Sequence, residues 1–264
     1  MRRKYPKPVS VFLAALLEES SQLISKEKLE ASPGLIESIN ADLLGLPQPQ
    51  KLPLKTELSS HEKCFQELFY GFGEIAEAYE TLNDLMSLVR FTPPKTFNIN
   101  KVRYLKFLKD AYFNEFYIFQ QRIDAYLGKI SHLYKTDPVV PNIAKTVAAL
   151  RKAINSCTNN FIGMRSSHVH KQRYTATDED MRRLNLLQIL AEHSEMKRKM
   201  RVLYSLAFRD AQRHTKQKFR EWNSAARAII VGTFDVLNRQ LLDKRKKLIY
   251  PVSKSQNRVT AGKK

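Results

Sequence analysis

The segment FIGMRSSHVHKQRY at 161–174 contains residues whose types suit phosphodiester cleavage: Arg165, Ser166, His168 and His170. An arginine guanidinium is a planar fork that matches phosphate oxygens, and a histidine exchanges protons near neutral pH. A base that activates an attacking hydroxyl and a cation that stabilises charge on phosphorus are the minimum for cleavage without a metal. This segment is therefore the candidate catalytic site.

The spacing of these residues leaves two pairings open. On a continuous helix Arg165 and His168 share a face, whereas Arg165 and His170 diverge by about 140° at 3.6 residues per turn. Pairing Arg165 with His170 therefore requires the helix to end or kink here, or a second copy to complete the site. Two further alternatives are an exposed basic turn with solvated histidines and a His-x-His metal site formed by His168 and His170.

Other common catalytic and binding sites are excluded because their sequence motifs are incomplete or absent. YGFGE at 70–74 lacks the third glycine of a dinucleotide fingerprint, and HEKCF at 61–65 has Phe65 where a zinc-protease helix needs its second histidine. No Gly-x-Ser-x-Gly nucleophile elbow is present. Cys64 and Cys157 match no metal or redox spacing. Apart from the His168–His170 alternative, the sequence therefore predicts neither a metal nor another cofactor.

The charge distribution points to a polyanionic partner. The 264 residues carry a formal net charge of +19, and residues 151–264 hold 26 Lys and Arg against 9 Asp and Glu. Such a field attracts nucleic acid or an anionic membrane surface. The two distant cysteines predict a reduced, cytoplasmic protein, and no apolar stretch is long enough to span a bilayer.

Hydrophobic periodicity predicts an all-α multi-helix bundle. Helices are expected over 57–90, over 100–134, where nine aromatic residues should form the core, and from Asn142 into the quoted segment. The next helix should begin at Thr177 as N-cap and run toward Phe208. A last helix should extend from Phe219 to Leu241, and no segment alternates apolar and polar residues as a strand would.

The pattern of Arg165, the polar Ser166 and His170 between late helices of an all-α chain resembles the HEPN superfamily. The resemblance implies an up-and-down helical core over 56–245. Residues 1–55 would then be peripheral N-terminal helices, including one near Pro33–Leu44, and a linker. Residues 246–264 would be a basic, flexible tail.

The resemblance also implies a function. Many HEPN proteins are homodimeric, metal-independent endoribonucleases of toxin–antitoxin or defence systems, some with a nucleotidyltransferase-type antitoxin. His170 would then assist attack of a ribose 2′-OH, Arg165 would hold the scissile phosphate and Ser166 would position one of them, with His168 as the alternative base. The residues expected to bind RNA are Lys171, Arg173, Tyr174, Arg182 and Arg183. The alternative is a non-catalytic helical nucleic-acid-binding or assembly protein.

Overall fold

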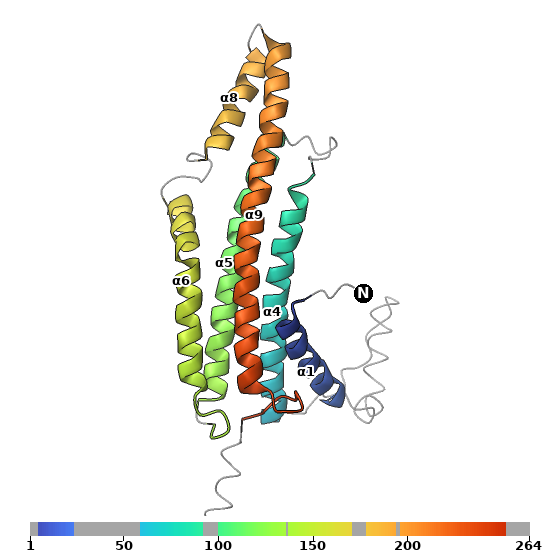
Figure 1. Ribbon diagram of the computed structural model, residues 1–264, viewed down its shortest axis with the longest axis vertical. Helices are drawn as coiled ribbons and strands as arrows, with labels where there is room; N and C mark the ends of the chain where they lie inside the picture. The colour runs from blue at the N-terminus through green and yellow to red at the C-terminus, as the bar shows by residue number, and fades with distance from the viewer. Residues whose placement is uncertain are drawn as a thin grey trace, which may run out of the picture. The chain divides into compact units, whose positions relative to one another are not determined.

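The regular secondary structure of the described part of the chain is helical. The computed structural model describes residues 5–23, 59–91, 100–135, 137–170, 178–193 and 196–251, except for the side chains of 160–170 and 193. These residues form six helices and no strand: α1 (Lys7–Leu23), α4 (Ser60–Leu88), α5 (Lys101–Leu133), α6 (Ile143–His170), α8 (Glu179–His193) and α9 (Lys197–Leu241) (Figure 1). The predicted all-α fold class is confirmed.

The chain divides into two compact units. The first combines residues 1–70, 130–144 and 231–264, and the second combines 71–129 and 145–230. The helix expected near Pro33–Leu44 lies outside the described residues. The domain boundaries expected after residues 55 and 245 stay predictions.

Local side-chain contacts explain where α4 and α5 begin. Ser59 and Glu62 form a capping box, in which the amide of Glu62 donates to Oγ of Ser59 at 3.2 Å and the amide of Ser59 donates to Oε2 of Glu62 at 2.8 Å. Before α5, Oδ1 of Asn100 accepts the amide hydrogen of Arg103 at 2.7 Å. Each contact satisfies an amide that the first helical turn leaves without a partner.

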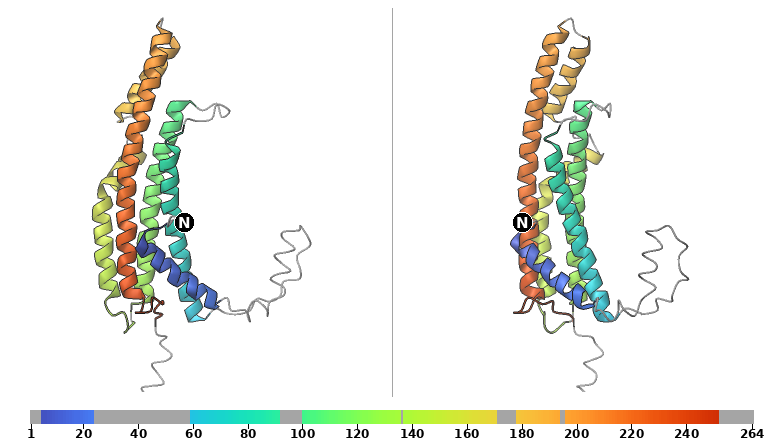
Figure 2. Two further views of the ribbon diagram at one scale, coloured as in Figure 1. Left: turned by 45° about the vertical axis from the view of Figure 1, so that its right-hand side comes forward. Right: turned by 90° about the vertical axis from the view of Figure 1, so that its right-hand side faces the viewer.

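In the second unit, α5 lies beside α4, α6 and α9 (Figures 1 and 2). Toward α4, Nη1 of Arg122 donates to the carbonyl oxygen of Glu74 at 2.8 Å. Toward α6, Asp124 accepts two hydrogen bonds from Arg151, each 2.5 Å long. Polar contacts therefore join α5 to its neighbouring helices, in addition to apolar packing.

Six of the nine aromatic residues that the sequence placed in the core are buried, whereas Phe107 is 64% exposed and Tyr104 and Tyr117 are half-buried. Tyr112 is fully buried and stacks on Phe219 of α9 with ring centroids 4.0 Å apart. Its hydroxyl donates to Oδ1 of Asn223 at 2.5 Å, and Nδ2 of Asn223 donates to the carbonyl oxygen of Leu82 in α4 at 3.5 Å. Burial raises the pKa of the Tyr112 hydroxyl. This buried polar contact joins α4, α5 and α9.

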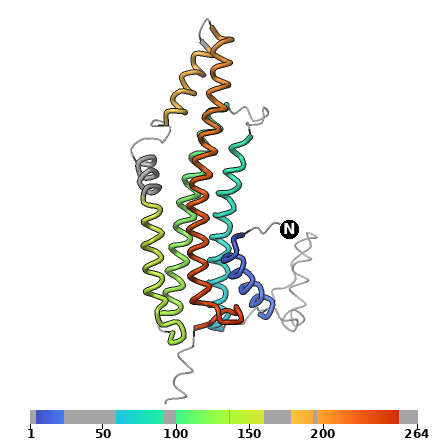
Figure 3. The backbone as a smooth tube through the Cα atoms, viewed as in Figure 1, coloured from blue at the N-terminus to red at the C-terminus, as the bar shows by residue number. Residues whose placement is uncertain are grey.

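The helices after the candidate motif differ from the prediction. The expected helix toward Phe208 ends at His193, and α9 then runs unbroken from Lys197 to Leu241 (Figure 3). Leu184 and Phe208 belong to one buried cluster, although about 36 Å would separate them along a straight helix at 1.5 Å per residue. The chain must turn back between them to bury both side chains.

The first unit brings α1 against the end of α9. The rings of Phe12 and Phe234 are 5.2 Å apart, and Nδ2 of Asn238 donates to the carbonyl oxygen of Pro8 at 2.8 Å. These contacts connect segments from the two ends of the described chain.

The chain folds back after α9. Lys246 has a φ of 63°, and the amide of Ile249 donates to the carbonyl oxygen of Leu241 at 2.9 Å. The hydroxyl of Tyr134 donates to the carbonyl oxygen of Ile249 at 2.7 Å. The flexible tail was predicted to begin at residue 246, but residues 246–251 belong to this packed turn. The remaining residues of the tail lie outside the described part of the chain.

The two glycines of YGFGE have different surroundings on α4. A Cβ atom at Gly71 would lie 2.4 Å from Cδ2 of Tyr126, whereas a Cβ atom at Gly73 would meet nothing within 4 Å. Tyr126 is 2% exposed, so its ring has little room to move. Gly71 therefore permits close packing of α4 on α5.

Replacing Gly71 with alanine should lower the free energy of unfolding by about 1–3 kcal/mol, because the added methyl overpacks the contact with Tyr126. Gly73→Ala is the matched control and should raise stability by up to about 1 kcal/mol, since alanine has the higher helix propensity. Urea unfolding followed by circular dichroism measures both variants. Equal changes in the two would contradict the assigned contact.

Candidate functional site

The candidate motif occupies the last turns of α6. The backbone is helical through His170, so Arg165, Ser166, His168 and His170 all lie on this helix. Their side chains lie outside the described part of the chain, as do the residues Lys171, Arg173 and Tyr174. The structure therefore places the motif at the end of α6, and the contacts of its side chains stay predictions.

The helical backbone bears on the two possible pairings. Because α6 does not end before His170, Arg165 and His168 lie three positions apart on one face. The direction of His170 differs from that of Arg165 by about 140° at 3.6 residues per turn. The choice between His168, which shares a face of the helix with Arg165, and His170, which would need a second copy, stays a prediction.

The first half of α6 is anchored on α5. The guanidinium of Arg151 forms a bidentate pair with Asp124, and this hydrogen bonding raises the pKa of Arg151. One turn later, Nε2 of Gln120 donates to Oδ1 of Asn155 at 3.3 Å. Planar, two-bond contacts of this kind restrict orientation as well as distance. They hold the helix that carries the motif.

The helix after the motif begins at a buried aspartate. The amide of Met181 donates to Oδ1 of Asp178 at 3.2 Å, so Asp178 is the N-cap of α8 and the prediction of Thr177 was wrong. Oδ2 of Asp178 also accepts from Nζ of Lys109 at 2.5 Å. A carboxylate can accept from the helix amide and also supply the counter-charge of a buried ammonium, which a neutral threonine hydroxyl cannot.

The Lys109–Asp178 ion pair lies in the interior. The two side chains are 3% and 2% exposed. Burial lowers the pKa of Lys109, while the hydrogen bond with Asp178 acts in the opposite direction and favours the ammonium form. The pair therefore connects α5 to the start of α8.

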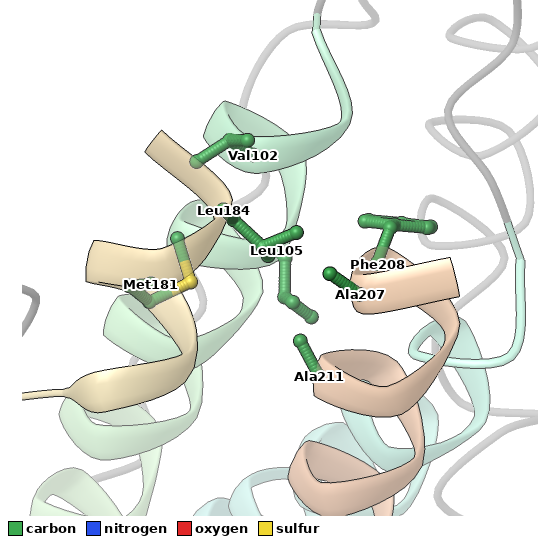
Figure 4. Packing of buried hydrophobic residues seen from close by; sticks show 7 residues of the cluster. All are labelled: Val102, Leu105, Met181, Leu184, Ala207, Phe208 and Ala211. Atoms are coloured by element: carbon green, nitrogen blue, oxygen red, sulfur yellow. The ribbon is translucent and has the colours of Figure 1, made fainter. Parts of the chain in front are cut away.

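Apolar packing holds the rest of α8 beside α5 and α9. Figure 4 shows the cluster, which is formed by Val102 and Leu105 of α5, Met181 and Leu184 of α8, and Ala207, Phe208 and Ala211 of α9. Arg182 and Arg183 are exposed. They are the two predicted RNA-binding residues whose side chains the structure describes, and they stay available to a ligand.

The exposed side of α8 is also apolar. Leu186 and Ile189 are 58% and 56% exposed, and Leu190 is exposed beside them. At 100° per residue these three side chains point away from the face that buries Met181 and Leu184. Large apolar side chains gathered on one solvent-exposed surface are typical of an interaction site.

Sequence reasoning missed two features of the second unit. Nothing in the sequence distinguishes Lys109 from the other lysines of α5 as the partner of a distant aspartate. The second feature, the charge of α9, did leave a signal: residues 197–230 hold ten Lys and Arg against two Asp and Glu, several at helical spacing. The cations of 197–201 belong to the predicted non-catalytic nucleic-acid binding, whereas the significance of those at 209–227 was not predicted.

The described residues contain neither a metal-binding cluster nor a membrane-spanning helix. In that part of the chain, no group of three or more His, Cys, Asp or Glu side chains could hold a metal ion. None of the helices described there is long and apolar enough to cross a membrane. Comparisons of the chain with protein-family models, curated proteins and solved structures found no match.

Replacing Asp178 with asparagine should lower the free energy of unfolding by about 3 kcal/mol, because the buried Lys109 ammonium loses its counter-charge. Asparagine is an equally good N-cap, so the loss reports on the ion pair. The double variant with Lys109→Met should recover most of the stability, as measured by urea unfolding. Additive losses in the double variant would show that the pair is not coupled.

Proposed function

We propose that this chain is a cytoplasmic, metal-independent endoribonuclease of HEPN type. The observation that supports the proposal is the position of the Arg165–His170 segment. It occupies the last turns of α6 in an all-helical unit, ahead of a helix whose exposed face carries Arg182 and Arg183. Helix ends let polar side chains project from a bundle toward a ligand. The two arginines can attract the RNA backbone to this end of α6.

In the proposed reaction a motif histidine accepts the proton of a ribose 2′-OH. The 2′ oxygen then forms a bond to the adjacent phosphorus, and the bond from phosphorus to the 5′ oxygen breaks. That oxygen leaves with the electron pair and takes up a proton, giving a 2′,3′-cyclic phosphate and a 5′-hydroxyl. Arg165 stabilises the added negative charge on the phosphate, and Ser166 positions the reacting groups.

The proposal includes a homodimer. Arg165 and His170 diverge on one helix, but they can meet in a dimer if each site takes Arg165 from one copy and His170 from the other. The exposed apolar surface formed by Leu186, Ile189 and Leu190 offers area for such a contact. A symmetric dimer would use the same surface of both copies. In toxin–antitoxin form, a nucleotidyltransferase-type antitoxin would be a further partner.

The first test is a nuclease assay on single-stranded and structured RNA in the presence of EDTA. Arg165→Ala and His170→Ala should each lower the cleavage rate by about 100-fold or more, the usual contribution of a positioned base or oxyanion partner. Circular dichroism should show an unchanged fold. Full activity in both variants removes the proposal, and loss in His168→Ala alone reassigns the base.

Mixing the two inactive variants tests the composite site. If Arg165 of one copy works with His170 of the other, a heterodimer of Arg165→Ala and His170→Ala keeps one intact site. Random exchange of subunits should then restore about a quarter of wild-type activity, because half of the dimers are mixed and each has one of two sites. If both residues act within one chain, mixing restores none.

Non-catalytic nucleic-acid binding is the second candidate function. It is favoured by the exposed cations at the start of α9, which are Lys197, Arg198, Lys199 and Arg201. Under this alternative, neutralising these four residues weakens binding in a salt-dependent manner, while Arg165 and His170 can be replaced without effect on it. The EDTA assay separates the two functions, because binding alone leaves the RNA intact.

A further inference from the structure

Hydrogen bonds join the end of α4 to the side of α9. Nε2 of Gln212 donates to the carbonyl oxygen of Val89 at 2.6 Å and to that of Phe91 at 3.1 Å. One glutamine side chain thus holds the last residues after α4, including Arg90, beside one turn of α9. Although Phe91 is large and apolar, it is 61% exposed.

A row of cations follows the same side of α9. At 100° per residue, Arg209, Arg213, Lys216, Arg220 and Arg227 lie within about 60° of one another around the helix, over a length of about 27 Å. Arg213 lies 3.6 Å from Asp210. For the other four, no acidic partner is found among the described residues.

Cations of α9 and of the segment that follows α4 lie close together at the middle of this row. The pKa of Lys216 is lowered by desolvation and by Coulombic repulsion from Arg90 and Arg220. Like charges held together without an internal counter-charge raise the local positive potential. An anion that binds from outside lowers this potential. The described structure therefore leaves positive charge here for a ligand to neutralise.

The form of the surface favours single-stranded nucleic acid over a lipid surface. Between residues 209 and 227 the exposed side of α9 carries no large apolar side chain that could enter a bilayer. A row of cations beside an exposed aromatic ring is the combination that binds single strands, because the cations contact phosphates and the ring stacks on a base. A duplex keeps its bases stacked on each other and would leave Phe91 unused.

We infer that this face of α9 and the adjoining end of α4 form a binding track for single-stranded RNA. Arg209, Lys216, Arg220 and Arg227, with Arg90, contact successive phosphates, and Phe91 stacks on a base. The inference rests on the proposed function in taking RNA as the ligand, and it adds a binding site that lies outside the α6 motif.

The experiment measures binding by fluorescence anisotropy with a labelled, single-stranded 2′-O-methyl RNA. This probe lacks the attacking hydroxyl, so binding is read whether or not the chain cleaves RNA. Lys216→Gln with Arg220→Gln should weaken binding and reduce the slope of log K against log salt by about 1.4, at roughly 0.7 per phosphate contact on a single strand. Lys145→Gln with Lys152→Gln removes the same charge from exposed sites on α6 and should change both quantities little.

Phe91→Leu tests the stacking contact separately. It should weaken binding by about 5- to 100-fold at constant salt slope, because a leucine side chain offers no ring to stack on. Circular dichroism of each variant verifies the fold. Poly-glutamate serves as a competitor that has charge but no bases.

The possible outcomes distinguish failure of the binding track from failure of the nuclease proposal. The track is overturned if the Lys216/Arg220 variant binds RNA like its α6 control, or if poly-glutamate competes fully and Phe91→Leu has no effect, which would indicate an acidic protein as the ligand. Cleavage that persists in the Arg165 and His170 variants would remove the nuclease proposal and leave the track standing. Cleavage lost in those variants with binding unchanged would support both.

Discussion

The arrangement of the second unit depends on one constraint: α5 has a buried face between its neighbouring helices, and each polar group that it carries inward has to find a partner. An unpartnered buried polar group costs more free energy than a hydrogen bond supplies. Lys109 therefore specifies the start of α8, and Tyr112 specifies α9. Asp124, whose side chain is 34% exposed, adds a bidentate contact with Arg151 of α6. Apolar packing alone would permit neighbouring helices to slide or rotate. These polar contacts define the register in which the helices meet.

That constraint also places the elements of the candidate site. The bidentate pair between Asp124 and Arg151 holds α6 upstream of its motif, and the pair between Lys109 and Asp178 holds the first residue of the next helix. The motif thus comes between two anchored points, both fastened to α5. A site that must exchange substrate benefits from this arrangement, because the reacting groups can be near a helix end while the scaffold stays rigid.

Much of the fold follows from periodicity. The blocks at 57–90 and 100–134 correspond to α4 and α5 within a few residues, because proline-rich segments interrupt the pattern and Ser59 and Asn100 cap the helices. The turn between α8 and α9 could not be predicted in this way. No glycine or proline marks it, and only the shared burial of Leu184 and Phe208 in three dimensions requires it.

The choice of Asp178 as N-cap shows the same limit. Thr177 and Asp178 are both good capping residues by type, so local preference cannot choose between them. The choice is made by Lys109, which lies 69 positions earlier in the chain and becomes a neighbour only in the folded unit. For the motif itself the sequence supplied the residue types, and the structure supplied the helical backbone on which they lie. The partner of Arg165 stays a prediction, since it depends on whether a second copy is present.

Under the proposed function, chemistry and charge belong to different helices, and this separation has a mechanistic consequence. Contacts on α9 would hold RNA equally in the ground state and the transition state, so they would lower KM without raising kcat. Groups at the end of α6 would act on charge that develops only during cleavage, so they would raise kcat. Because α5 contacts both α6 and α9, a strand held along α9 would meet α6 in a defined register. Because α5 holds α6 and α9 in place, RNA that α9 binds through its phosphates would then present one particular bond to the motif on α6.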